Sequence, residues 1–135
     1  MSEAVAPEPV VVVGGAGRLG FALPMDRVHR LVRSTDLPPR YRSASLPRLF
    51  DLPSAPPEDA RYAEVLGGEP DTFLDLGDHV RVLTPRPGDL EPLPPLLATV
   101  AARWGWTALV RDGDARRVLV DVLRLAALAA PRTRP

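Results

Sequence analysis

The sequence contains no cysteine, so it can form neither a disulfide framework nor a thiolate metal site. It lacks a run of about 18 apolar residues, and its N-terminus lacks the basic and then apolar pattern of a signal peptide. We therefore expect a soluble, cytoplasmic protein. Lysine, asparagine, glutamine and isoleucine are also missing, and all 17 basic residues are arginine, a bias typical of a GC-rich genome or of partner recognition through arginine. The formal net charge of zero argues against nucleic acid as a partner.

Proline and glycine, by contrast, are abundant, with 17 and 10 of the 135 residues. Both residues interrupt regular structure, so their number favours many short strands over long helices. The length fits a single domain with its own core. We expect a disordered tail over residues 1–9, one domain over residues 10–130 and a second tail over residues 131–135.

The stretch after Val10–Val13 supports two incompatible interpretations. Its letters from Gly15 to Gly20, Gly-Ala-Gly-Arg-Leu-Gly, match a dinucleotide-binding loop, which would make the chain an NAD(P)-binding enzyme fragment. In a Rossmann unit, a long helix begins within that loop. Here Pro24 would fall in the interior of the helix, where it costs about 3 kcal/mol. The nucleotide site therefore stands only as an alternative.

The pattern of side chains after the glycines favours a strand instead. Leu19, Phe21 and Leu23 alternate with small residues at period two, which predicts one buried face. Residues Gly14–Gly17 then form a hairpin turn between two antiparallel strands, because glycine adopts positive φ without steric cost.

Further short segments continue the β pattern. The predicted strands are Arg61–Leu66, Phe73–Leu76, His79–Leu83, Trp106–Val110 and Val118–Val120. Tight turns are expected at Gly77-Asp78 and at Asp112-Gly113. Residues 84–95 hold five prolines and form an extended connection, and residues 98–103 have helical potential. Asp121 is placed to cap a closing helix that runs to Ala130.

Residues with catalytic potential do not form a catalytic pattern. His29 and His79 lack the spacing of metal ligands, and Ser34, Ser43, Ser45 and Ser54 lie in no nucleophile elbow. Strand and turn geometry disperses the carboxylates of residues 71, 75 and 78. Trp104 and Trp106 are expected on one side of a strand, in a packing role. We predict no enzymatic activity, no cofactor and no metal site.

The segment GRLGFALPMDRVHRLVRSTDLPP, residues 17–39, resembles the opening of CheW-like chemotaxis adaptors. In that family, a hairpin ending in a Phe-Ala-Leu-Pro type sequence leads to a short turn with a Val-x-x-Val/Leu-x-Arg pattern and a Leu-x-Pro. Here Met25, Val28 and Val32 of that turn have helical spacing. Residues Leu46–Leu52 are similar to the family's Val-Pro-Val-Val-Asp-Leu strand. Weaker similarity extends over residues 71–83, 90–97 and 116–125.

The resemblance implies a mostly β protein of two small intertwined barrel-like (SH3-like) lobes of short antiparallel strands with a C-terminal helix. It also implies a non-enzymatic adaptor or scaffold in a chemotaxis-like signalling system. Its partners would be a histidine kinase regulatory domain, a chemoreceptor or another CheW-like adaptor. A generic β-barrel protein-binding module without a chemotaxis link is the remaining alternative.

The chain departs from the family between Pro39 and Leu46. Family members have about twenty residues there, including an Arg-Gly hairpin that helps to contact the receptor, whereas this chain has a handful and no Arg-Gly. We interpret it as a shortened variant. Arginine and aromatic residues are typical anchors of interfaces, and the predicted partner-binding residues are Arg40, Tyr41, Arg42, Arg48 and Phe50.

Overall fold

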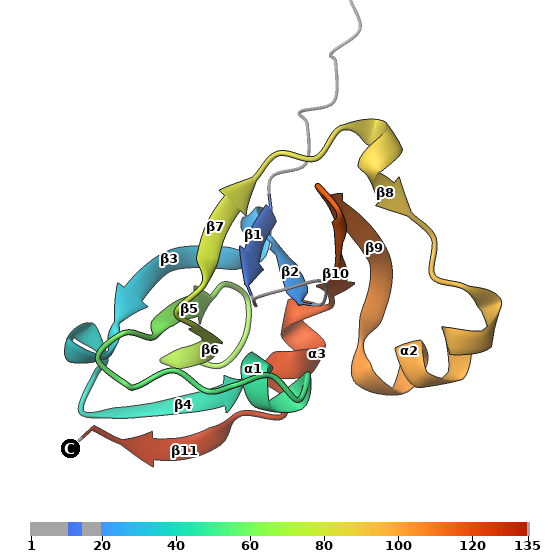
Figure 1. Cartoon of the computed structure of the whole chain (residues 1–135). Helices are drawn as coiled ribbons and strands as arrows, with labels where there is room; N and C mark the ends of the chain where they lie inside the picture. The colour runs from blue at the N-terminus through green and yellow to red at the C-terminus, as the bar shows by residue number, and fades with distance from the viewer. Residues whose placement is uncertain (1–10, 15–19, 135) are drawn as a thin grey trace, which may run out of the picture.

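The computed structural model describes residues 11–14 and 20–134 (Figure 1). The strands are β1 (Val11–Gly14), β2 (Phe21–Pro24), β3 (Val28–Arg33), β4 (Arg40–Ser45), β5 (Arg61–Val65), β6 (Thr72–Gly77), β7 (Val80–Leu83), β8 (Leu90–Glu91), β9 (Trp106–Asp112), β10 (Ala115–Val120) and β11 (Ala130–Thr133). The helices are α1 (Leu46–Leu49), α2 (Ala98–Trp104) and α3 (Val122–Ala126). Short 3₁₀ turns lie at Met25–Arg27, Ser34–Asp36, Pro87–Asp89 and Pro95–Leu97.

The described strands form two sheets. The first sheet has the order β7-β1-β2-β10-β9-β8, and the second has the order β11-β4-β6-β5-β3. The chain starts in the first sheet, builds β3 to β6 of the second, returns for β7 to β10 and ends in the second with β11 (Figure 1). The two lobes are therefore intertwined, as predicted. The sheets are mixed, because β10 pairs with β2 and β4 pairs with β6 in parallel.

The residues after the glycine stretch form a strand. Gly14 lies opposite Phe21 in the antiparallel pair of β1 and β2. Both Phe21 and Leu23 are fully buried, which confirms the strand face predicted from their alternation. The turn was predicted over Gly14–Gly17; Gly14 is the last residue of β1, whereas residues 15–17 and Leu19 lie outside the described residues. The dinucleotide hypothesis required a helix where β2 stands, so the structure does not favour it.

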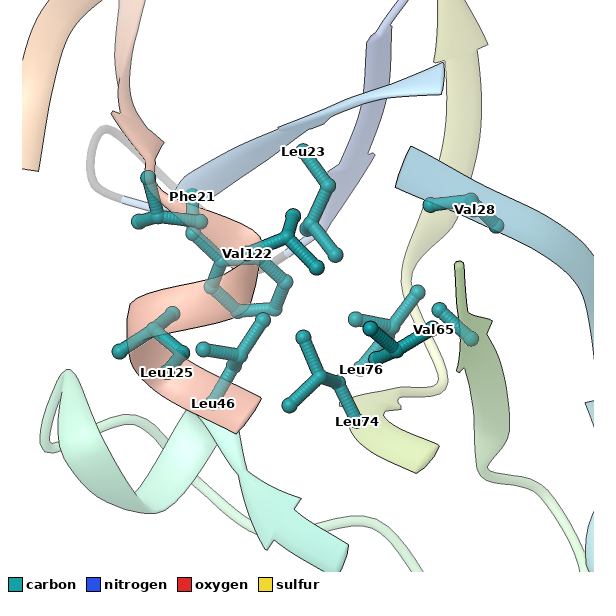
Figure 2. Packing of buried hydrophobic residues seen from close by; sticks show 11 residues of the cluster. Phe21, Leu23, Val28, Leu46, Val65, Leu74, Leu76, Val122 and Leu125 are labelled. Atoms are coloured by element: carbon teal, nitrogen blue, oxygen red, sulfur yellow. The ribbon is translucent and has the colours of Figure 1, made fainter. Parts of the chain in front are cut away.

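The main core lies between the two sheets and under α3 (Figure 2). Phe21 and Leu23 reach it from β2, Leu74 and Leu76 from β6, and Leu125 from α3. Asp121 caps α3 as predicted, because its carboxylate accepts a hydrogen bond from the Arg124 N–H at 3.2 Å. Elements from both ends of the chain thus share one core.

The helical spacing of Met25, Val28 and Val32 was misleading. Only Met25–Arg27 form a helical turn, and residues 28–33 form β3, which pairs with β5. Two residues four apart lie on the same face of a strand as well as of a helix. Val28 and Val32 are accordingly both buried, although the ladder shifts register between Val28 and Arg30.

The segment Leu46–Leu52 is not the strand that the resemblance predicted. It begins with α1, for which Ser45 is the N-cap, and the Ser45 hydroxyl accepts a hydrogen bond from the Arg48 N–H at 3.3 Å. Pro47 lies in the first turn of this helix, where a missing N–H has no cost. The strand lies just before it, as β4.

Two glycines with positive φ separate elements that the sequence placed together. Gly77 has φ of 77°, as a tight turn requires, but it connects β6 of the second sheet to β7 of the first, so these strands are not a hairpin. Gly105, with φ of 73°, ends α2 and separates it from β9. Trp104 and Trp106 therefore lie on different elements and do not share a strand face.

The C-terminal residues belong to the fold. Helix α3 ends at Ala126, four residues before its predicted end, and Ala130–Thr133 form β11 against β4. The domain therefore extends past the predicted boundary at residue 130. Arg134 fixes this end, because its N–H donates to the Pro39 carbonyl at 2.9 Å and its guanidinium to the Leu37 carbonyl at 2.8 Å.

Candidate functional site

Three of the five predicted partner-binding residues lie on β4. Arg40 and Arg42 are exposed, and Tyr41 between them is half-buried with its ring edge-on to Phe73, at a centroid distance of 6.2 Å. Alternation along the strand places both arginines on one face and Tyr41 on the other. Tyr41 is therefore partly a packing residue, and the arginines present charge to solvent.

A hollow of about 370 Å³ opens beside these residues. Its lining, which we call the arginine hollow, is Arg40, Tyr41, Arg42, Pro70, Asp71, Pro131, Arg132 and Thr133. The last three residues come from β11, whose register sets Arg132 opposite Tyr41 and Thr133 opposite Arg40. A strand from the C-terminus thus completes a surface that begins at residue 40.

The other two predicted residues, Arg48 and Phe50, lie at α1, separate from the arginine hollow. Arg48 is exposed, and Phe50 follows the helix as a half-buried residue. The ring of Phe50 lies 5.6 Å from that of Phe21 and stacks on Trp106 at 5.9 Å. Phe50 therefore connects the surface to the main core.

Beside Phe50 lies a second depression, of about 260 Å³, lined by Leu49, Phe50, Trp106 and Leu125. We call it the apolar hollow. Leu49 is 40% exposed at its rim. Its lining comes from α1, β9 and α3, so it lies where the elements of the two sheets meet. This arrangement suits an apolar side chain of a partner.

Sequence reasoning missed several residues of both hollows. Arg132 was assigned to a tail, although its arginine-rich setting was a usable signal. Trp106 was identified as a packing residue only, and Leu49 and Leu125 were not singled out. Leu49, Trp106 and Leu125 meet at the apolar hollow only because α1 and α3 lie close to β9, and no local sequence pattern predicts that packing.

The histidines and carboxylates with catalytic or metal-binding potential are dispersed in the structure. His79 lies 3.6 Å from Asp78 in an exposed pair, whereas His29 is on β3, at the edge of the second sheet. No cluster of three metal-ligating side chains occurs in the described ranges. Burial raises the pKa of the Asp75 carboxyl, and hydrogen bonds from the Gly77 N–H and the Ser45 hydroxyl offset only part of that effect.

Tyr62 lies opposite Asp75 in the pair of β5 and β6. Its own burial, and then the nearby Asp75 and Tyr41, raise the pKa of the Tyr62 phenol. Tyr62 and Asp75 line neither the apolar hollow nor the arginine hollow, whereas Tyr41 lines the arginine hollow.

A comparison with known structures identifies the fold. The chain is similar to the scaffolding protein TtCheW from Thermoanaerobacter tengcongensis, with a TM-score of 0.64 and 17% identity over 87% of this chain and 92% of that protein. The fold is therefore CheW-like: mostly β, with two lobes and a helix near the C-terminus. No protein-family model matches the sequence, and no curated protein matches it. Among the described residues, no helix has the length and apolar character needed to cross a membrane.

Proposed function

We propose that this chain is a non-enzymatic adaptor of a bacterial chemotaxis-like signalling system. Its partners are a histidine kinase regulatory domain, a chemoreceptor or another CheW-like adaptor, and it acts in the cytoplasm. The observation that carries the proposal is the CheW-like fold, which extends over 87% of the chain and 92% of a scaffolding protein.

Two separate surfaces support an adaptor. The apolar hollow, with Phe50 and Leu49, offers an apolar contact at the junction of the lobes, and the arginine hollow offers a charged one on the second sheet. An adaptor needs two such surfaces to connect two partners. Arg48 lies beside the apolar hollow on α1 and would contribute charge at the rim of that contact.

The short connection between Pro39 and Leu46 limits the number of partners that we propose. Only β4 separates these residues, so no additional hairpin projects there. We expect the protein to keep one CheW-fold contact, with a kinase regulatory domain or a second adaptor. We do not expect it to assemble a receptor–adaptor–kinase array alone.

The test uses the full chain with a purified kinase regulatory domain, a chemoreceptor cytoplasmic fragment and a CheW-like paralogue from the same organism. Binding of at least one is expected in calorimetry. Leu49→Asp should weaken it about tenfold or more, because the contact would desolvate a charge. Val82→Asp is the matched control: Val82 is 55% exposed on β7 and should leave binding unchanged. Absence of binding to all three partners would favour a generic β-barrel binding module.

A further inference from the structure

The arginine hollow concentrates positive charge that the described structure does not neutralise. Arg40 and Arg42 of β4 line it on one face of the sheet, and both are exposed. Arg132 of β11 also lines the hollow, but it lies opposite Tyr41, so its side chain is on the other face. Arg40 and Arg42 are therefore the two arginines that can act together on one ligand.

Other arginines of the protein have carboxylate partners. Arg30 lies 2.7 Å from Glu64, and Arg111 lies 2.9 Å from Glu91. Within the described ranges, none of the three arginines of the hollow has a carboxylate oxygen within 4.0 Å. Arg42 donates one long hydrogen bond, of 3.4 Å, to the Ala129 carbonyl.

The balance of charge around the hollow is positive. Asp71 is the acidic residue in the lining, against Arg40 and Arg42 on one face of the sheet and Arg132 on the other. The whole chain has a formal net charge of zero, so this surplus is local. Like charges held close together repel one another, and a negatively charged ligand would relieve that repulsion.

We propose that the arginine hollow binds an extended acidic segment of a protein partner, with carboxylates at alternate positions. The inference rests on the proposed adaptor function, since it names the chemistry of one of the partners. Arg40 and Arg42 are two residues apart on one strand, which separates them by about 6–7 Å. An extended acidic segment repeats its carboxylates at the same spacing, so both arginines can engage at once.

Arginine suits this ligand because its planar guanidinium binds a carboxylate through two parallel hydrogen bonds. The contact is made by side chains, and not by adding a strand to the sheet. β11 is the edge strand on this side of the sheet, and its Pro131 lacks an N–H that could pair with a further strand. Recognition then depends on charge and spacing, which makes it sensitive to salt.

The probe is a fluorescent peptide of alternating glutamate and threonine, with a glutamine and threonine peptide as its uncharged counterpart. Anisotropy at about 50 mM NaCl should show binding of the acidic peptide alone, and raising the salt to about 300 mM should weaken it. The variant Arg40→Glu/Arg42→Glu should weaken binding about tenfold or more, because it replaces two attractive charges by repulsive ones. The only side-chain hydrogen bond lost among the described residues is the long one from Arg42 to the Ala129 carbonyl, so the variant should fold.

Arg86→Glu is the matched control, since Arg86 is exposed in the other lobe. Its replacement changes the net charge by the same amount as each Arg→Glu replacement in the hollow. It should leave peptide affinity within about twofold. Equal loss in this control, equal binding of the glutamine peptide, or tighter binding of a single-stranded oligonucleotide would each overturn the inference.

The partner assays separate this inference from the adaptor function. If the Arg40→Glu/Arg42→Glu variant binds every partner of the wild type normally, the acidic-segment proposal fails and the adaptor function stands. If the acidic peptide binds through the arginines while none of these partners binds, the adaptor function fails and the hollow's chemistry stands.

Discussion

The Arg117 guanidinium lies 3.1 Å from the Asp112 carboxylate, and their side chains are only 7% and 10% exposed. Arg81 of β7 donates to the same carboxylate oxygen. In a flat sheet of this order, β7 and β9 would lie roughly 19 Å apart, which an arginine side chain cannot span. The contact therefore requires the first sheet to curl, and Asp112 holds the two sides of the barrel-like lobe together.

Acidification should weaken the ion pairs that Asp112 makes with Arg81 and Arg117. Burial by itself would raise the pKa of the Asp112 carboxyl, but hydrogen bonds from Arg81 and Arg117 outweigh it and lower that pKa below its usual 3.8. The folded state therefore favours the charged form, so its stabilisation is present above about pH 4 and is lost as pH falls through the folded pKa. Asp112→Asn should cost about 1.5–3 kcal/mol at pH 7, the usual range for hydrogen bonds to a charged group.

Denaturant unfolding between about pH 3 and pH 7 measures this dependence. The wild type should lose more free energy of unfolding on acidification than Asp112→Asn does. Asp114→Asn is the control, because Asp114 is exposed in the same turn. Parallel pH profiles for the wild type and Asp112→Asn would contradict the role of this carboxylate.

A second prediction concerns the glycine once assigned to a nucleotide loop. A Cβ on Gly20 would lie 2.3 Å from the Gly14 carbonyl oxygen and 2.6 Å from an Arg117 nitrogen, so the backbone itself must move. Gly20→Ala should destabilise the protein by about 1–3 kcal/mol, as overpacking does. A Cβ on Gly88 meets nothing within 4 Å, so Gly88→Ala should leave the melting temperature nearly unchanged.

Calorimetry with NAD and NADP tests whether Gly20 is a glycine because a Cβ there has no room or because it belongs to a nucleotide-binding loop. We expect no dissociation constant below about 1 mM, a value that corresponds to a binding free energy of roughly 4 kcal/mol. Micromolar binding that Gly20→Ala abolishes would restore the dinucleotide hypothesis.

The parts of the fold that the sequence predicted correctly depend on strong local signals. Pro24 excludes a long helix, Phe21 and Leu23 alternate, and Asp121 caps the helix that follows β10. These features are confirmed because each follows from the geometry of a few neighbouring residues. The glycines and prolines also located most strand ends.

The errors arose where one local pattern fits two structures or where pairing is distant. The spacing of Val28 and Val32 suits a strand as well as a helix, and only pairing with β5 decides between them. Arg132 belongs to a strand because β4 is available to pair with it. For the same reason, the sequence identified Arg40 and Arg42 as surface candidates but could not assemble the arginine hollow.

A third prediction tests the core. Phe21 is fully buried against Leu23 and its neighbours in the main core, so Phe21→Ala should cost about 3–5 kcal/mol. Leu96→Ala is the control, since Leu96 is 95% exposed and its truncation should change stability by no more than about 0.5 kcal/mol. Chemical denaturation measures both. Equal losses would mean that Phe21 is not a core residue.

The last prediction has the opposite pH dependence. Because burial raises the pKa of Asp75 above its usual 3.8, the folded state favours the neutral carboxyl. The contribution of neutral Asp75 to the free energy of unfolding is present below about pH 4. It is lost as pH rises through the pKa of Asp75 in the folded state, so at pH 7 the buried charge destabilises the protein. Asp75→Asn keeps an oxygen that can accept the hydrogen bond from the Gly77 N–H, which is 2.9 Å long in the wild type. It should therefore increase the free energy of unfolding at pH 7, and the gain should vanish below about pH 4.

A spectroscopic titration checks the same variant independently of stability. The protein has two tyrosines, so the ionisation of Tyr62 can be followed by ultraviolet absorbance. Burial and then the Asp75 charge raise the pKa of the Tyr62 phenol, so Asp75→Asn should lower it while burial keeps it above 10.0. Asp78→Asn, at an exposed residue of the adjoining turn, should leave both measurements unchanged. A stability gain that persists at pH 3, or a Tyr62 pKa that does not move, would show that the buried charge of Asp75 is not the cause.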